Sequence, residues 1–170
     1  MLLPGQPFPK LDLPRVGGGR IRNDTIIAPA MTVLNVYRGL HCPRCHRQFD
    51  DFVAHRAVME EQGIRVVSIS TDNWQRAEKT VRDWGLGDLP VGHDLTIDQA
   101  RALGLPISSS IRDGEPAEFA EAGLFFIRPD GVLWGWSVNS FPFLRPTSEM
   151  ILDAIATQKK RNYPPRGNVA

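Results

Sequence analysis

The chain has 170 residues, of which 42% are hydrophobic and 23% charged, and its 20 lysines and arginines nearly balance 19 aspartates and glutamates. This length suits one domain that buries a core without disulfide or metal staples, so we expect a single domain over residues 1–170. The net charge of +1 gives no reason to expect bulk nucleic-acid or anionic-membrane binding. We therefore expect no nucleic-acid partner and no membrane partner.

We expect no secretory signal at the start of the chain. Its first ten residues contain three prolines, and no basic residue precedes Lys10, which is unlike a secretory signal. The longest apolar run, residues 26–36, is interrupted by polar residues and a proline and falls short of the ~20 residues of a membrane span. We therefore expect a cytoplasmic protein, in which a close cysteine pair is catalytic or metal-binding rather than structural.

The first part of the chain predicts a hairpin followed by a buried strand. Residues 1–25 indicate an extended arm, in which 11–14 and 20–22 pair around three consecutive glycines. The almost continuously apolar run at 32–37 is typical of a strand that is buried on both faces.

A long helix is predicted directly after this strand. Pro43 at the first internal position costs no hydrogen bond there, so the helix begins at Cys42, and Gly63 ends it. Its expected apolar face consists of Phe49, Phe52, Val53 and Ala57.

A second strand and helix follow at once. Residues 64–70 read as a strand, and Thr71 or Asp72 is expected to cap a helix that closes at Gly85. The apolar stripe expected on this helix is Trp74, Ala77, Val81 and Trp84.

The remaining chain alternates short elements with loops. In order, we expect an extended segment at 89–92, a helix capped by Thr96, a loop over 105–121, a hairpin of strands at 124–127 and 132–138, and a last helix capped by Thr147 before a tail at 159–170.

This order of elements predicts an α/β fold with a mixed sheet and helices on both faces. The strand–helix–strand unit needs a parallel, right-handed crossover, whereas the late hairpin needs antiparallel neighbours. The two cysteines then lie where the first parallel strand runs into its helix, which is where chemistry usually collects in such sheets.

Cys42 and Cys45 form a C-x-x-C motif at the start of the predicted helix. Residues three apart share a helix face, with Cβ atoms about 5–6 Å apart. Unpaired N–H groups and the helix dipole favour the thiolate of Cys42, and Arg38 and Arg44 can add positive potential. Cys45, one turn further on, is expected to be more buried and less reactive, so one sulfur attacks and the other resolves.

Three other interpretations of the motif stay open. A zinc site needs four ligands, and beside the cysteines the chain offers only carboxylates and His41, His46, His55 and His93. The string Cys42-x-x-Cys45-His46 also matches c-type haem attachment, and a buried pair of inert thiols is the plainest alternative. The missing export signal and the strand–turn–helix context favour the thiol device, so we expect neither a metal nor a cofactor.

Residues 36–45, Val-Tyr-Arg-Gly-Leu-His-Cys-Pro-Arg-Cys, resemble the Y-R-G-x-x-C-P-x-C signature of peroxiredoxin-like proteins. These belong to the alkyl hydroperoxide reductase / thiol-specific antioxidant family of the thioredoxin superfamily. The resemblance extends through 68–72, 93–94, 124–131 and 163–167 and so spans most of the chain. It implies a thioredoxin-like fold, a nucleophilic Cys42 and reduction of peroxides or disulfides. Independently of the resemblance, His41 directly precedes Cys42 and is expected either to tune the pKa of Cys42 or to serve a plain surface or packing role.

The chain departs from the usual pattern of these relatives at two places. Typical peroxiredoxins carry P-x-x-x-T-x-x-C before the reactive cysteine, and here Asn35 and Gly39 stand at the proline and threonine positions. Typical thioredoxins place a cis-proline before the strand that faces the active site, where this chain has Ala122-Gly123. The resemblance therefore implies the thiol chemistry more strongly than it implies a particular substrate.

Three functions follow from this reading. In a peroxidase, Cys42 attacks a peroxide and Cys45 resolves the product to an intramolecular disulfide. In a disulfide reductase, Cys42 attacks a partner's disulfide instead, and in a redox-sensing or binding module the pair does not turn over. The enzymatic readings imply a peroxide or disulfide substrate and an external thioredoxin-like or glutaredoxin-like reductant, and they leave room for a homodimer.

Oxidation is expected to link Cys42 to Cys45 within one chain. No third cysteine competes, and the spacing of three residues favours closure. On a non-reducing gel, protein treated with stoichiometric peroxide should therefore run as a monomer; a dominant covalent dimer would contradict the expectation.

Overall fold

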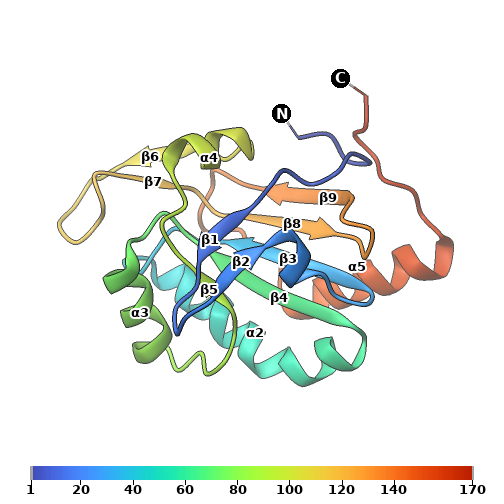
Figure 1. Cartoon of the computed structure of the whole chain (residues 1–170), viewed down its shortest axis with the longest axis horizontal. Coiled ribbons are helices and arrows are strands. Elements are labelled where there is room, and N and C mark those ends of the chain that lie inside the picture. Colours follow the sequence, from blue (N-terminus) through green and yellow to red (C-terminus); the bar gives the residue numbers. More distant parts are fainter. Residues whose placement is uncertain (1, 170) are drawn as a thin grey trace.

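A computed structural model describes residues 2–169 of the chain and contains a five-stranded central sheet (Figure 1). In spatial order the strands are β5 (Val91–Gly92), β4 (Ile64–Ile69), β3 (Met31–Val36), β8 (Gly123–Ile127) and β9 (Leu133–Val138). β3 pairs in parallel with β4 and antiparallel with β8, so the mixed sheet predicted from the order of elements is confirmed.

The sheet separates two apolar cores. On one side, side chains of β3 and β4 pack with those of α2 (Pro43–Glu61) and α5 (Ser148–Arg161), and α3 (Trp74–Asp83) lies beside β5. On the other side the cover consists of the hairpin β1 (Asp12–Pro14)–β2 (Arg20–Arg22), α1 (Asn23–Ile26), α4 (Ile97–Ala102) and the hairpin β6 (Ile107–Ser109)–β7 (Glu118–Ala120). Helices therefore lie on both faces, as the sequence predicted. Among the described residues, no helix combines the length and the apolarity that a membrane crossing requires.

β3 is the centre of this arrangement because all six of its residues are buried. Val33 faces the core beneath α2 and α5, whereas Leu34 and Val36 face the opposite core. An almost continuous apolar run is typical of a strand with both faces buried, so this prediction is confirmed.

The loop expected over 105–121 is wrong, because part of it forms the hairpin β6–β7. Ile107 pairs with Ala120, and Phe119 is completely packed against its surroundings. Each strand has only three residues, too few for an alternating pattern to stand out in the sequence. The hairpin instead depends on contacts with residues that are distant in the sequence.

Three of the helix starts are confirmed, and one is wrong. Cys42, Thr96 and Thr147 are the N-caps of α2, α4 and α5, and each accepts a hydrogen bond from the backbone three residues on. The cap of α3 is Asn73 rather than Thr71 or Asp72, because Asn73 Oδ1 accepts from the Arg76 N–H at 3.1 Å. Asp72 is instead buried, and its carboxylate accepts a hydrogen bond from the Leu40 N–H.

The apolar helix faces were predicted only in part. Phe49 and Phe52 of α2 are buried, but Val53 and Ala57 are exposed, and so is Trp74 of α3. The helices touch the sheet along narrower stripes than the apolar residues suggest, and Met59 completes the buried stripe of α2. Exposed single apolar side chains are common on soluble proteins.

Phe49→Ala should lower the free energy of unfolding by about 3–5 kcal/mol, because it leaves a cavity in place of a fully buried ring. Val53→Ala, one turn further along the same helix, should change it by less than about 0.5 kcal/mol because this side chain is exposed. Urea unfolding followed by circular dichroism measures both; equal losses would mean that the buried face of α2 has been assigned incorrectly.

Candidate active site

Cys42 and Cys45 lie at the first turn of α2, immediately beyond the carboxyl end of β3. Cys42 is the N-cap, and its Sγ accepts a hydrogen bond from the Cys45 N–H at 3.3 Å. Both thiols are free, and both are buried, with exposed fractions of 1% and 0%. Both sulfurs therefore sit beneath the surface rather than on it.

Arg38, at the end of the strand, connects Cys42 to an acidic side chain from another part of the chain. Its Nη1 lies 3.8 Å from Cys42 Sγ, and its Nε donates to Glu121 Oε1 at 3.2 Å. Glu121 is itself buried at the end of β7 and accepts from Ser108 Oγ at 2.6 Å. The Phe119 ring supports the guanidinium from below, with 4.9 Å between the guanidinium carbon and the ring centre. The guanidinium is thus held against the sulfur from several sides.

The environment makes the two thiols chemically different. The pKa of Cys42 is lowered to about 5, first by a hydrogen bond from the Cys45 thiol and then by the Cys45 N–H and the Arg38 guanidinium, against the opposing effect of burial. The pKa of Cys45 is raised well above its ordinary value by burial and by the adjacent Cys42 sulfur. At neutral pH, Cys42 is therefore the thiolate and Cys45 the thiol that donates to it.

Cys45 has a second cation beside it that the sequence did not suggest. Arg145, in the loop before α5, places Nη2 3.9 Å from Cys45 Sγ and Nη1 3.5 Å from Gln48 Oε1. The backbone N–H of Arg38 also donates to Cys45 Sγ at 3.4 Å. A negative charge that reaches Cys45 during reaction would therefore meet donors already in place.

His41 and Arg44, the other two candidates from the sequence, lie apart from the sulfurs. The His41 ring packs on Phe119 with 4.6 Å between ring centres, and burial together with Arg38 lowers its pKa to about 4. It is therefore neutral at pH 7 and adds no positive charge. Arg44 is exposed and lies over the Phe143 ring. Within residues 2–169, neither side chain has a hydrogen bond to Cys42 or Cys45.

The loop that presents Cys42 explains why no threonine stands at position 39. Gly39 has φ 128°, and a Cβ there would lie 2.8 Å from the Asp72 carboxylate. That carboxylate accepts the Leu40 N–H at 2.7 Å and the Arg76 Nε at 2.7 Å, so it cannot move aside without cost. Only glycine fits, and the hydroxyl that typical relatives use at this place is replaced by a fixed turn.

The histidines that a zinc site would need are engaged elsewhere. His46 stacks on Trp84 with 4.7 Å between ring centres, and His55 and His93 lie beside Asp51 and Asp94. Throughout the described range 2–169, no three His, Cys, Asp or Glu side chains are grouped as metal ligands would be.

Comparisons with known proteins bear on the family and the fold of the chain. A family model described as AhpC/TSA family matches residues 4–134. A mutant of peroxiredoxin 6 from Arenicola marina is 18% identical with a TM-score of 0.78, over 96% of this chain and 76% of that one. AhpC of Enterococcus faecalis is 19% identical with a TM-score of 0.75, over 96% of each chain. Reduced Prx3 of Vibrio vulnificus in complex with hydrogen peroxide is 17% identical with a TM-score of 0.76, over 91% of this chain and 99% of that one. The search of curated proteins found no match by sequence.

The pKa of Cys42 should depend on Arg38. In the unaltered protein the ultraviolet absorbance of the thiolate should fall as the pH is lowered through about 5. Arg38→Met removes the neighbouring cation and should raise this midpoint by roughly one pH unit.

Arg44→Met is the matched control, because Arg44 is exposed and turned towards Phe143. It should leave the midpoint in place. Equal midpoints in all three proteins would show that Arg38 does not stabilise the thiolate.

Proposed function

The chain belongs to the AhpC/TSA family of thiol-dependent peroxidases, and from this premise we propose that Cys42 reduces a peroxide and that Cys45 then closes an intramolecular disulfide. The observation that carries the proposal is the position of the buried Cys42 Sγ, which lies 3.8 Å from Arg38 Nη1 and accepts the Cys45 N–H at 3.3 Å. The lowered pKa of Cys42 and the raised pKa of Cys45 agree with this arrangement. The three residues are the nucleophile, the resolving group and a cation at one place.

In the first step the Cys42 thiolate attacks the outer oxygen of the peroxide. The O–O bond breaks, the sulfur becomes a sulfenic acid, and the leaving alkoxide or hydroxide takes up a proton. Negative charge moves from the sulfur to the oxygens during this step. The guanidinium that Glu121 and Phe119 hold beside Cys42 Sγ is placed to stabilise that charge.

In the second step Cys45 attacks the sulfenic sulfur. An S–S bond forms, the sulfenic hydroxyl leaves with the thiol proton as water, and the pair has been oxidised by two electrons. Arg145 and the Arg38 N–H lie beside Cys45 Sγ and favour its ionisation as the proton leaves. An external dithiol then returns both cysteines to thiols.

The burial of Cys42 favours a small peroxide over a protein disulfide as the substrate. Exchange with a disulfide requires both sulfurs of the partner disulfide to align with Cys42 Sγ. Only 1% of the surface of Cys42 is exposed, which leaves little room for this alignment. A peroxide of a few atoms needs a far smaller opening. We therefore place disulfide reduction second and a redox sensor that does not turn over third.

The reductant, the compartment and the assembly complete the proposal. A thioredoxin-like or glutaredoxin-like dithiol suits a single intramolecular disulfide as its target. Because each cycle must return Cys42 and Cys45 to thiols, we propose a reducing compartment, the cytoplasm, for the protein. A homodimer stays part of the proposal and is tested by sedimentation of the reduced and oxidised protein.

The two cysteine variants should fail at different steps. Cys42→Ser should lower the rate of peroxide consumption by about a thousandfold, because no thiolate faces the peroxide. Cys45→Ser should keep the first reaction and then stop as a sulfenic acid. Dimedone labelling and intact-protein mass spectrometry distinguish the two.

Other outcomes would select the other functions. A mixed disulfide with a protein substrate in Cys45→Ser, without reaction towards hydrogen peroxide or cumene hydroperoxide, would favour the disulfide reductase. One round of oxidation without cycling in the presence of thioredoxin and its reductase, or glutaredoxin and glutathione, would favour the sensor. Full turnover by Cys42→Ser would contradict the assignment of the nucleophile.

A further inference from the structure

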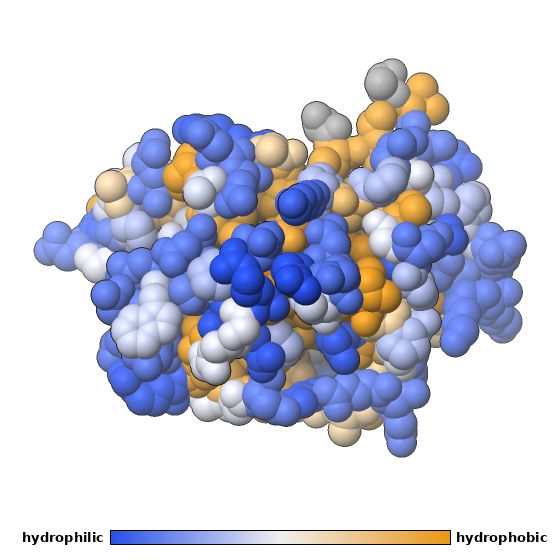
Figure 2. Space-filling view, viewed as in Figure 1, coloured by the Kyte–Doolittle hydropathy of each residue, from blue (hydrophilic) through white to orange (hydrophobic). Residues whose placement is uncertain are grey.

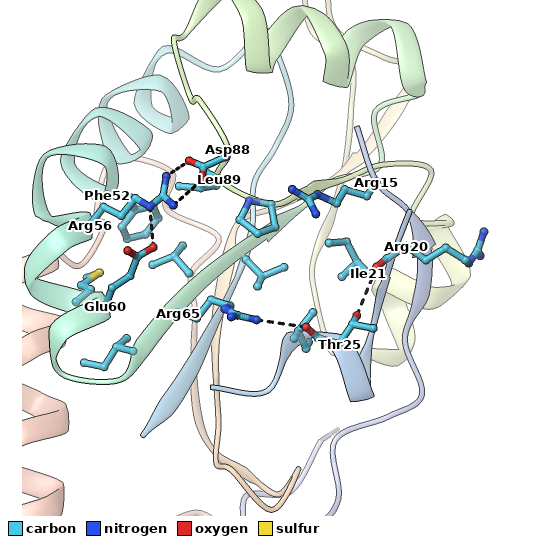
Figure 3. A pocket seen from close by; sticks show the side chains of 16 residues that line it. Arg15, Arg20, Ile21, Thr25, Phe52, Arg56, Glu60, Arg65, Asp88 and Leu89 are labelled. Carbon is cyan, nitrogen blue, oxygen red and sulfur yellow. Dashed lines mark hydrogen bonds and ion pairs between the residues drawn. The ribbon is translucent and has the colours of Figure 1, made fainter. Parts of the chain in front are cut away.

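A cavity of about 300 Å³ lies at one edge of the central sheet, between β4, the second half of α2 and the hairpin β1–β2 (Figure 3). It exists because β5 has only two residues and pairs with β4 at Ser68 and Ile69 alone. The first half of β4 therefore has no neighbouring strand on that side. The cavity occupies the place where the missing length of β5 would run.

Apolar side chains form one part of the lining of the cavity, which we call its floor. Because the edge of the sheet is open there, side chains from both cores reach the cavity, and they include Ile21, Phe52, Met59, Val67 and Leu89. A hollow of this size with an apolar floor and a few convergent polar groups is the usual form of a small-molecule site.

The rim of the cavity is basic. Four arginines line it against two carboxylates, and Arg56 engages both of these, with Nε 2.7 Å from Glu60 Oε1 and Nη2 2.9 Å from Asp88 Oδ2. Figure 2 shows the most hydrophilic side chains gathered over the hairpin β1–β2 on this face, with apolar patches between them. The positive charge in excess therefore resides on the remaining arginines.

Arg15 and Arg65 are the two cations that the protein leaves uncompensated at the cavity. Neither has a carboxylate within ion-pair distance in the part of the chain from residue 2 to 169, whereas Arg20 pairs with Asp12. Arg15 Nε is buried and has no hydrogen-bond partner there, and Arg65 Nη1 reaches only the Thr25 carbonyl oxygen at 3.3 Å. Figure 3 shows both side chains among those that line the cavity, with Arg65 directed towards Thr25. A buried donor without a partner costs free energy, and an anionic group between them would remove that cost.

We propose that this cavity binds a small amphipathic anion, with a carboxylate or phosphate group between Arg15 and Arg65 and a short apolar body on the floor. The site is separate from the active site, because Cys42 and Arg56 are 14 positions apart on α2, which corresponds to about 20 Å along a helix. An extended peptide added to β4 is less suited. Only residues 64–67 offer a free edge, which is shorter than the usual strand of about 5–6 residues.

Octyl phosphate is the probe for the test, applied below its micelle concentration to the whole reduced protein. Isothermal titration calorimetry should show one site, and amide chemical shifts should move at β4 and β1–β2 rather than at Cys42. Octanol, which has the same body without charge, should bind at least tenfold more weakly. Protein alkylated at Cys42 should bind octyl phosphate equally well, so the result does not depend on the proposed peroxidase function.

Arg65→Gln is the main variant, because Arg65 is exposed and its loss does not threaten the fold. It should weaken binding about tenfold, and Arg15→Gln should do the same. Arg101→Gln removes an equal charge from α4, away from the cavity, and should leave the affinity unchanged.

Several results would overturn the proposal. These are no binding of octyl phosphate, equal affinity in Arg65→Gln and the unaltered protein, or shifts confined to other surfaces. Binding of an acidic peptide that octyl phosphate does not displace would assign the edge of β4 to strand addition instead. Cosedimentation with vesicles of phosphatidylcholine and phosphatidic acid that octyl phosphate does not prevent would assign the arginines to a membrane surface.

Discussion

The buried ion pair between Arg38 and Glu121 organises the active site and the part of the fold around it. A charge taken out of water needs a partner and further hydrogen bonds, and here each side chain supplies them for the other. Arg38 Nη1 lies beside Cys42 Sγ, while Glu121 accepts from Ser108. The ion pair thereby ties the loop before α2 to the hairpin β6–β7. The same contact that stabilises the thiolate also holds two distant segments together.

A second constraint sets the position of Cys42 itself. The chain must turn sharply from β3 into α2, and the buried Asp72 carboxylate holds the turn by accepting the Leu40 N–H. The same carboxylate fills the space in which a side chain at Gly39 would lie. The site has therefore exchanged the orienting hydroxyl of typical relatives for a rigid backbone turn. In the proposed reaction, Arg38 and the N–H groups at the start of α2 stabilise the charge on Cys42 Sγ.

The open edge of β4 lies beside the second half of α2, away from the cysteines. A strand of two residues leaves both cores exposed to one cavity, and arginines rather than further backbone cover it. Arg56 neutralises the two carboxylates nearby, which leaves Arg15 and Arg65 with unused donors. One helix thus carries the two cysteines at its first turn and borders the proposed anion site some turns later. The two places share a scaffold but no side chain.

The sequence alone determined the features that depend on neighbours along the chain. The apolar run of β3, the caps Cys42, Thr96 and Thr147, and the closeness of Cys42 to Cys45 follow from local periodicity and local hydrogen bonding. The α/β class with a mixed sheet followed from the order of these elements. Where an alternative cap was available one residue on, as at Asn73, the local signal no longer chose correctly.

Only the tertiary structure decided which distant residues meet the sulfurs. Arg38 was visible because it lies four positions from Cys42, but Glu121 lies 83 positions from Arg38 and Arg145 lies 100 from Cys45. The sequence also placed His41 and Arg44 beside the thiols, whereas the ring packs on Phe119 and the guanidinium turns to solvent over Phe143. The strands β6 and β7 are too short to show a pattern of their own. They form because Phe119 and Glu121 find partners elsewhere in the fold, and side-chain direction of this kind is set by packing rather than by position along the chain.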